Sequence, residues 1–313
     1  MRLIGTFMWL YTCLSCGGLE GGGVVDDATN VGGLDAGSSS RPSADGGVLP
    51  VADAGDPGQL SRRLEIEATP AETEYLNHWI DQDHGEPFVS SLKWLPHYIH
   101  EQGELGICLR LDFRSEWDLD WTYLESIRQI IEERVWEWQI GLIGEPHWIH
   151  DQVTPVRLFG IGATETVNLT NIPEEVPIYR NDNGECPTDC FRFTYKHEAA
   201  PDYPNCEHPS MSHFDFNIWY SDFAFGAAGH GGDWGTRLDW AIFRRERSRG
   251  RFRVTDHELG HVAGLPDVYN YPETLNGQQR PDAIMAESPT LKNLDYLMLR
   301  KVWEWGWDRY YRE

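Results

Sequence analysis

Two histidines spaced four residues apart most constrain the fold of this 313-residue chain. They are His257 and His261 in the stretch HELGH, and Glu258 follows the first of them. In an α-helix, residues four apart lie on one face with Cβ atoms about 5–6 Å apart. Both imidazoles can therefore reach one zinc ion at about 2.0–2.1 Å, with Glu258 beside them as a proton acceptor. The spacing predicts a helix that carries part of a zinc site.

The residues after the second histidine predict where the helix ends and where the third ligand lies. Gly264 stands where the helix must stop, because glycine adopts the left-handed conformation without steric cost. Leu265 and Pro266 offer no ligand atom, so the carboxylate of Asp267 is the first donor after the turn. These three ligands leave a fourth position open, as catalytic zinc sites do. His230 is the next candidate for the third ligand.

The stretch HELGHVAGLPD resembles the motif of the metzincin clan of zinc metallopeptidases, which is HExxHxxGxx followed by His or Asp. Within that clan it resembles the snapalysin-like enzymes, which use Asp. The resemblance implies that His257, His261 and Asp267 bind one catalytic zinc ion and that Glu258 is the general base. Met285, in DAIMAES, matches the methionine turn that underlies the metal in the clan.

A vaguer similarity covers residues 186–305 and includes GGDWG and LDYLMLRKVW. It is a similarity to secreted microbial proteins that often carry a cellulose-binding module and have no settled activity, and no such module is evident in this sequence. The chain also differs from small snapalysins in its size, its insertion at residues 186–206 and its Trp-rich end. These differences leave the substrate open.

Hydrophobic periodicity predicts the order of the other elements. Alternation predicts a strand over residues 105–113, and helical spacing of apolar residues predicts a helix over 121–142. We expect strands in TPVRLFGIGA and HFDFNIWYSDFAF, a glycine-rich loop in GAAGHGGDWG and a last helix in LKNLDYLMLRKVWEW. This order predicts an α+β fold. The resemblance implies a zincin or metzincin-like domain: a mixed β-sheet, an active-site helix, a methionine turn and a C-terminal helix.

The N-terminus has the pattern of an export signal. Arg2 and an apolar run over residues 3–14 form a signal-peptide pattern within residues 1–16, which is too short to span a bilayer permanently. It resembles a bacterial lipoprotein signal, with Cys16 as the acylated residue. We therefore expect an exported protein that is anchored to a cell envelope by a lipid, with plain secretion as the alternative.

Composition separates a tether from one folded domain. Residues 17–63 are rich in Gly, Ala, Asp and Ser, and they cannot bury enough apolar surface to fold. Residues 64–313 are expected to form a single catalytic domain. The net charge of −24 opposes binding to nucleic acid, because neutralising phosphates requires Lys and Arg. We expect membrane contact only through the lipid anchor, and a monomer.

Four cysteines lie outside the signal, and an even number in an exported chain predicts disulfide bonds. They are Cys108, Cys186, Cys190 and Cys206, and they allow three pairings. The alternative is a second zinc site that includes His208, but the single residue between Cys206 and His208 is unlike the usual zinc spacings.

Three further groups have both a functional and a structural interpretation. His230 and Asp233 either line the cleft or belong to an ordinary turn. Tyr269 and Tyr271 either donate a hydrogen bond to the oxyanion or serve in packing. The tryptophans at 303–307 either stack on sugar rings or belong to the core.

Together these patterns predict an exported zinc endopeptidase that hydrolyses peptide bonds in proteins or peptides. A zinc-bound water is the nucleophile and Glu258 is the general base. Two alternatives stay open: a zinc hydrolase that acts on cell-wall or polysaccharide-associated material, and a non-catalytic surface binding protein with a structural metal.

Overall fold

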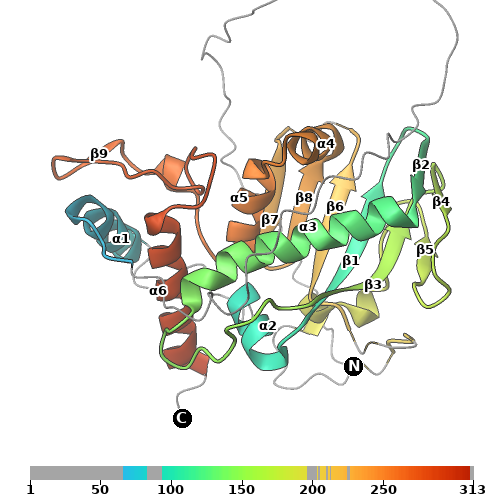
Figure 1. The fold of residues 1–313 in the computed structure, drawn as a ribbon, viewed down its shortest axis with the longest axis horizontal. Coiled ribbons are helices and arrows are strands. Elements are labelled where there is room, and N and C mark those ends of the chain that lie inside the picture. The colour runs from blue at the N-terminus through green and yellow to red at the C-terminus, as the bar shows by residue number, and fades with distance from the viewer. Residues whose placement is uncertain are drawn as a thin grey trace, which may run out of the picture. The chain divides into compact units, whose positions relative to one another are not determined.

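Six strands form one β-sheet in the computed structural model of this chain (Figure 1). They are β1 (Leu105–Asp112), β3 (Val156–Ala163), β5 (Ile178–Arg180), β6 (Phe216–Ser221), β7 (Gly229–Gly232) and β8 (Gly235–Asp239). Their order across the sheet is β5-β3-β1-β6-β8-β7, and neighbours are parallel except for β7 and β8. The sheet is therefore mostly parallel, with one antiparallel strand at its edge.

Helices accompany this sheet, and the fold is α+β as predicted. Within the described residues the α-helices are α1 (Pro70–Gln82), α2 (Leu95–Gln102), α3 (Trp121–Gln139), α4 (Trp240–Arg249), α5 (Arg253–Val262) and α6 (Asn293–Tyr310). Short 3₁₀ helices are η2 (Ile140–Leu142), η3 (Thr188–Cys190), η4 (Arg192–Tyr195) and η5 (Val268–Asn270). Two small strand pairs lie outside the main sheet: β2 (Trp117–Asp120) with β4 (Val167–Thr170), and β9 (Thr274–Leu275) with β10 (Gln278–Gln279).

The structure describes only part of the chain. The described residues are 66–82, 94–195, 203, 205–208, 211, 213–223 and 226–310, all within the compact unit Ser43–Glu313. The predicted signal at 1–16, with lipidation of Cys16, and the tether at 17–63 lie outside the described residues. Among the helices of the described ranges, none has both the length and the apolar character needed to cross a membrane.

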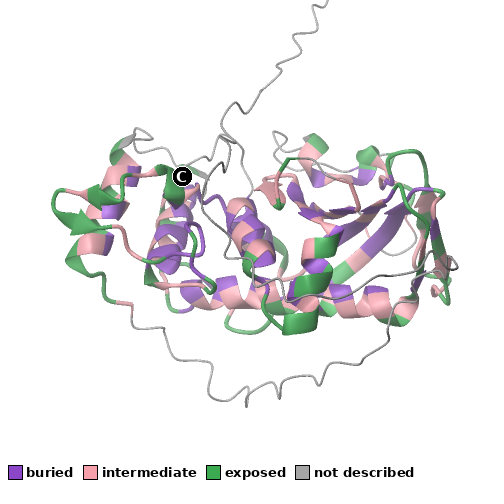
Figure 2. Cartoon of the chain, turned by 90° about the horizontal axis from the view of Figure 1, so that it is seen from above, coloured by how far each residue is buried: buried purple, intermediate pink, exposed green. Residues whose placement is uncertain are grey.

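The long helix α3 lies across one face of the sheet (Figure 1). It begins where Asp120 accepts a hydrogen bond from the backbone N–H of Tyr123 at 2.8 Å, a typical N-cap. The predicted apolar stripe is buried as expected: Leu124, Ile127, Ile130, Ile131, Val135 and Trp138. The stripe and every second residue of β1 belong to the same main core, and Figure 2 shows where buried residues lie along the elements.

The opposite face of the sheet carries a smaller cluster that two disulfides cross-link. Cys108 of β1 is bonded to Cys186, and Cys190 to Cys206. These two pairs answer the pairing that the sequence leaves open. They also remove the thiolates that a second zinc site with His208 would need, and the His208 Nε2 atom lies 2.6 Å from the carbonyl oxygen of Phe159 instead.

The C-terminal helix α6 belongs to the core rather than to the surface. Trp303 is buried, whereas Trp305 and Trp307 are partly buried against the main core. The Trp303 indole donates to the carbonyl of Pro146 at 2.9 Å, and Trp307 stacks on His147 at 4.2 Å between ring centroids. These contacts favour the packing interpretation of the tryptophans over sugar binding.

One expected loop is a strand. The segment GAAGHGGDWG contains β7, in which His230 pairs with Arg237 of β8. Glycine has a low strand propensity, which is why the sequence favours a loop. Pairing with β8 and contact with α5 override that propensity.

Candidate metal centre

The helix that carries the two histidines is held at its start by a side chain from the preceding helix. Glu246 of α4 is buried, and its carboxylate accepts hydrogen bonds from the backbone N–H and the hydroxyl of Thr255, at 3.2 and 2.8 Å. The first of these bonds satisfies a backbone N–H group that has no partner within the first turn of α5. At the other end, Gly264 has φ +90°, the left-handed turn that the sequence predicts.

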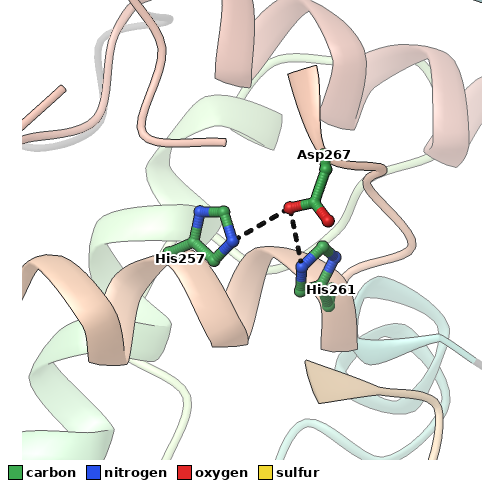
Figure 3. A group of neighbouring side chains, drawn as sticks. All are labelled: His257, His261 and Asp267. Atoms are coloured by element: carbon green, nitrogen blue, oxygen red, sulfur yellow. Dashed lines mark ion pairs between the residues drawn. The ribbon is translucent and has the colours of Figure 1, made fainter. Parts of the chain in front are cut away.

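The three predicted ligands converge on one point (Figure 3). His257 and His261 project from one face of α5, and the chain turns back after Gly264 to bring Asp267 in front of them. The Oδ1 atom of Asp267 lies 3.1 Å from Nε2 of His257 and 3.2 Å from Nε2 of His261. Among the described residues these three form the group whose ligand atoms lie within 4.8 Å of one another, and His230 does not belong to it.

The spacing of these atoms fits a small metal ion. Ligands about 2.0 Å from a tetrahedral zinc ion lie about 3.3 Å from one another. A carboxylate oxygen and an imidazole nitrogen both carry lone pairs, so at 3.1 Å they repel unless a proton or a metal cation lies between them. Either a proton on an imidazole or a metal cation satisfies this geometry, and two nitrogens with one oxygen are ligand types that zinc accepts.

The far side of each imidazole is held by a backbone carbonyl. His257 Nδ1 lies 2.9 Å from the carbonyl oxygen of Ile284, and His261 Nδ1 lies 2.8 Å from that of Leu265. Because a carbonyl oxygen only accepts, each Nδ1 carries the hydrogen. This leaves each Nε2 to face Asp267, which is the arrangement in which outer hydrogen bonds orient histidine ligands of metals.

Opposing effects act on the pKa of Asp267, the third predicted ligand. Burial raises the pKa of Asp267, but hydrogen bonds and positive charge from His257 and His261 lower it more, so the pKa lies well below its ordinary value. The carboxylate is therefore ionised, as a metal ligand must be.

Glu258 lies between α5 and the edge strand. Its side chain is only 5% exposed, and burial raises its pKa to about 8 in the metal-free protein. Among the described residues, its Oε2 atom has no hydrogen-bond partner. A Cβ atom on Gly229 of β7 would lie 2.5 Å from the Glu258 Oε1 atom, so any other residue there would displace the Glu258 side chain. Glu258 is therefore a buried carboxyl group that holds its proton more tightly than an exposed glutamate does in the metal-free protein.

Met285 lies beneath the helix that carries the ligands. It is fully buried, and its sulfur packs against Gly260, where a Cβ atom would collide with it. Gly260 lies between the two histidines in the sequence, so its missing side chain lets the Met285 turn approach the backbone of α5. Met285 therefore packs directly beneath the helix that carries the two histidines.

The remaining candidates divide between the site and the core. Tyr269 follows Asp267 on η5, is 43% exposed, and its ring is nearly parallel to that of His257 at 6.1 Å. Tyr271 instead packs edge-on against His78 at 5.4 Å. His230 lies on β7, where burial lowers its pKa, and the nearby Arg237 and His261 lower it further. Asp233 lies in the turn between β7 and β8.

Several contributors to the site are absent from the sequence-based predictions. The backbone carbonyls of Ile284 and Leu265 carry no side-chain signal that could reveal them. Gly229 stands in a glycine-rich stretch, and its role depends on an approach between strand and helix that only the fold creates. Asp295, which binds the Met285 turn, lies ten residues from Met285 and outside the zinc-binding motif.

Comparisons with known proteins identify no relative of this chain. No protein-family model, no curated protein and no solved structure matches the chain.

Proposed function

We propose that this protein is a zinc-dependent endopeptidase with a metzincin-like domain, in which His257, His261 and Asp267 bind the metal. The observation that carries the proposal is the convergence of these three ligand atoms beside a buried, otherwise unbonded carboxyl oxygen of Glu258. Three protein ligands with an open fourth position are typical of catalytic zinc, whereas structural zinc has four protein ligands.

Each residue at the centre has a definite task in hydrolysis. Bound zinc supplies a Lewis acid that polarises the peptide carbonyl and lowers the pKa of a water molecule to about 7. Glu258 takes the proton of the attacking water at Oε2 as the new C–O bond forms. It then delivers that proton to the amide nitrogen as the C–N bond breaks, so the products are an amine and a carboxylic acid, which releases its own proton to the solvent.

The edge strand supports a peptide as the substrate. β7 pairs with β8 on one side, and among the described residues no strand pairs with its other side. Extended peptides bind such edges through main-chain hydrogen bonds. Because Gly229 and Gly231 lie against Glu258 and His261, a peptide on this edge passes close to the metal centre.

The proposal includes the place of the protein in the cell. The sequence pattern of residues 1–16 supports export, and Cys16 supports attachment to a bacterial cell envelope through a lipid. Fractionation of cells that express Cys16→Ala tests this part alone, since the folded domain is unchanged. Release of the variant into the medium is expected, and unchanged membrane association counts against the anchor.

The decisive test of activity compares the wild type with Glu258→Gln, which replaces one oxygen by NH₂. Internally quenched peptides, peptidoglycan and cellulose are incubated with each protein, with and without a zinc chelator. We expect the wild type to cleave peptides, the chelator to abolish cleavage and zinc to restore it, and the variant to be inactive with zinc retained. Release of products from peptidoglycan or cellulose alone would support the hydrolase alternative. Bound zinc without turnover of any substrate would support a binding protein.

A further inference from the structure

A buried carboxylate on the C-terminal helix holds the turn beneath the metal centre. Asp295, in the first turn of α6, is fully buried. Its Oδ2 atom accepts from the backbone N–H of Ile284 at 2.8 Å and of Lys292 at 2.8 Å, and its Oδ1 atom accepts from the N–H of Met285 at 3.2 Å. Three N–H groups from two segments thus meet on one side chain.

The two residues held by Asp295 offer their carbonyls to the metal centre. Ile284 O faces His257 Nδ1 at 2.9 Å, and Met285 O accepts from the N–H of Val268 at 2.8 Å. Val268 directly follows the ligand Asp267 in the sequence. Asp295 is therefore two hydrogen bonds away from one ligand imidazole and from the backbone next to another ligand.

Part of this arrangement is ordinary helix capping. Asp295 is the third residue of α6 and bonds back to the N–H of Lys292, which precedes the helix, as an acidic residue does in a capping box. A cap alone would not require the bonds to Ile284 and Met285, which lie eleven and ten residues away. Those two bonds end in the turn that contacts the ligands, so they have a consequence beyond helix stability.

We propose that Asp295 is a positioning residue of the metal centre: through the peptide groups of Ile284 and Met285 it sets the orientation of the His257 imidazole and the place of Asp267. The inference rests on the proposed function only in that the centre binds zinc. Partners in this outer position are typically worth about 10–100-fold in metal affinity. His261, which is held by Leu265 O in the turn that ends its own helix, does not depend on Asp295.

The test compares Asp295→Asn with the control Asp222→Asn. Asp222 also accepts from two consecutive backbone N–H groups, those of Arg114 at 2.7 Å and Ser115 at 2.9 Å, and from the Trp117 indole at 3.2 Å. None of these donors belongs to the metal centre. The control therefore reports what the loss of a carboxylate with a similar set of backbone donors, on a less buried residue, does to the fold alone.

Two measurements are made on each folded protein, checked by circular dichroism. Zinc affinity is measured by competition with a chromogenic chelator, and the visible spectrum of the Co²⁺-loaded protein reports ligand geometry. We expect Asp295→Asn to bind zinc about 10–100-fold more weakly, with an altered Co²⁺ spectrum. We expect Asp222→Asn to match the wild type in both. Equal zinc affinity and identical spectra for Asp295→Asn and the wild type would overturn the inference.

A measurement on the wild type covers the case in which Asp295→Asn does not fold. The amide hydrogens of Ile284 and Met285 are expected to exchange far more slowly than in an unstructured peptide, in metal-free protein as well as with zinc, because Asp295 holds both. Exchange at the unstructured rate would overturn the inference. Failure of the proposed function is distinguishable, because a wild type that binds zinc but cleaves nothing leaves these expectations unchanged.

Discussion

The two histidines of the metal centre share one helix but are held by different regions of the molecule. The local segment, residues 253–267, holds His261 through Leu265 O, four residues away. The remote segment, residues 283–295, holds His257 through Ile284 O, which lies 27 residues away. The comparison shows that a ligand pair with a regular local spacing still depends on a distant part of the chain.

The two segments also differ in burial. His257 and His261 are half-buried, whereas Met285 and Asp295 are fully buried in or beside the core. The local segment carries the predicted ligands, and the remote segment holds them in position through buried contacts. Changes in the first should therefore abolish function outright, and changes around the second should weaken metal binding or fold stability by degrees.

The largest expected effect is at the end of the local segment. Asp267→Ala should lose both zinc and peptide hydrolysis, because two imidazoles bind zinc far more weakly than three ligands do. Asp267→His should partly restore zinc, since His occupies this position in the commoner motif that the sequence resembles. Zinc content by elemental analysis and hydrolysis of a quenched peptide measure both variants. Full zinc and activity in Asp267→Ala would show that the third ligand lies elsewhere.

The next effect separates catalysis from metal binding within the same segment. Glu258→Ala removes no ligand atom, so it should keep zinc and fold while peptide hydrolysis falls by about 10²–10⁴-fold. The comparison of kcat with zinc content decides the outcome. A Glu258→Ala protein that has lost its zinc would contradict the role of this residue as a base alone.

A smaller effect is expected where the edge strand crosses Glu258. In Gly229→Ala, the new Cβ would lie 2.5 Å from Glu258 Oε1, so the carboxylate must move. Displacing a catalytic group by about 1 Å can lower the rate about 10²-fold. We therefore expect kcat to fall by up to that factor while zinc is retained. Gly232→Ala is the control, because its Cβ would meet the Trp234 side chain rather than Glu258. Equal activity in both variants would argue against close contact between β7 and Glu258.

The smallest expected effect concerns pH and the stability of α5. Burial raises the pKa of Asp256, next to His257, to about 8. The unfolded chain releases this proton near pH 4. Because the folded pKa is the higher one, the stabilisation is complete below about pH 4 and is lost as the pH rises through about 8.

Thermal unfolding of the metal-free protein at pH 5 and pH 8 measures this loss. We expect the Tm to fall between these values, and to fall less in Asp256→Asn, whose side chain does not ionise. Asp118→Asn, on the exposed part of β2, controls for the change of charge. Its Tm should fall between pH 5 and pH 8 by as much as that of the wild type. If the Tm of Asp256→Asn fell between pH 5 and pH 8 by as much as that of the wild type, the buried, protonated state of Asp256 would be contradicted.

Much of the fold is predictable where periodicity is local. The spans of β1 and α3 agree with the strand and helix expected for residues 105–113 and 121–142, because alternation and helical spacing report which face of an element is buried. The helices α1 and α2 have no counterpart among the expected elements. The prediction of a loop at β7 is wrong, because glycine carries no periodic signal and the strand conformation comes from pairing with β8.

The sequence by itself determined the local chemistry of this protein. The pattern of His257, Glu258, His261 and Asp267 is sufficient to predict a shared site, because helical periodicity and a turn at Gly264 place them within a few residues of one another. Cysteine parity likewise predicts disulfides but leaves their pairing open.

Only the tertiary structure decided what holds that chemistry in place. The cysteine pairs, the crossing of β7 over Glu258, and the bonds from Asp295 to the turn at Met285 all join residues from separate elements of the fold. Such contacts depend on how the sheet and helices pack, and packing is a property of the whole core rather than of any short stretch. A backbone carbonyl such as Ile284 O is present at every residue, so only its position in the fold distinguishes it.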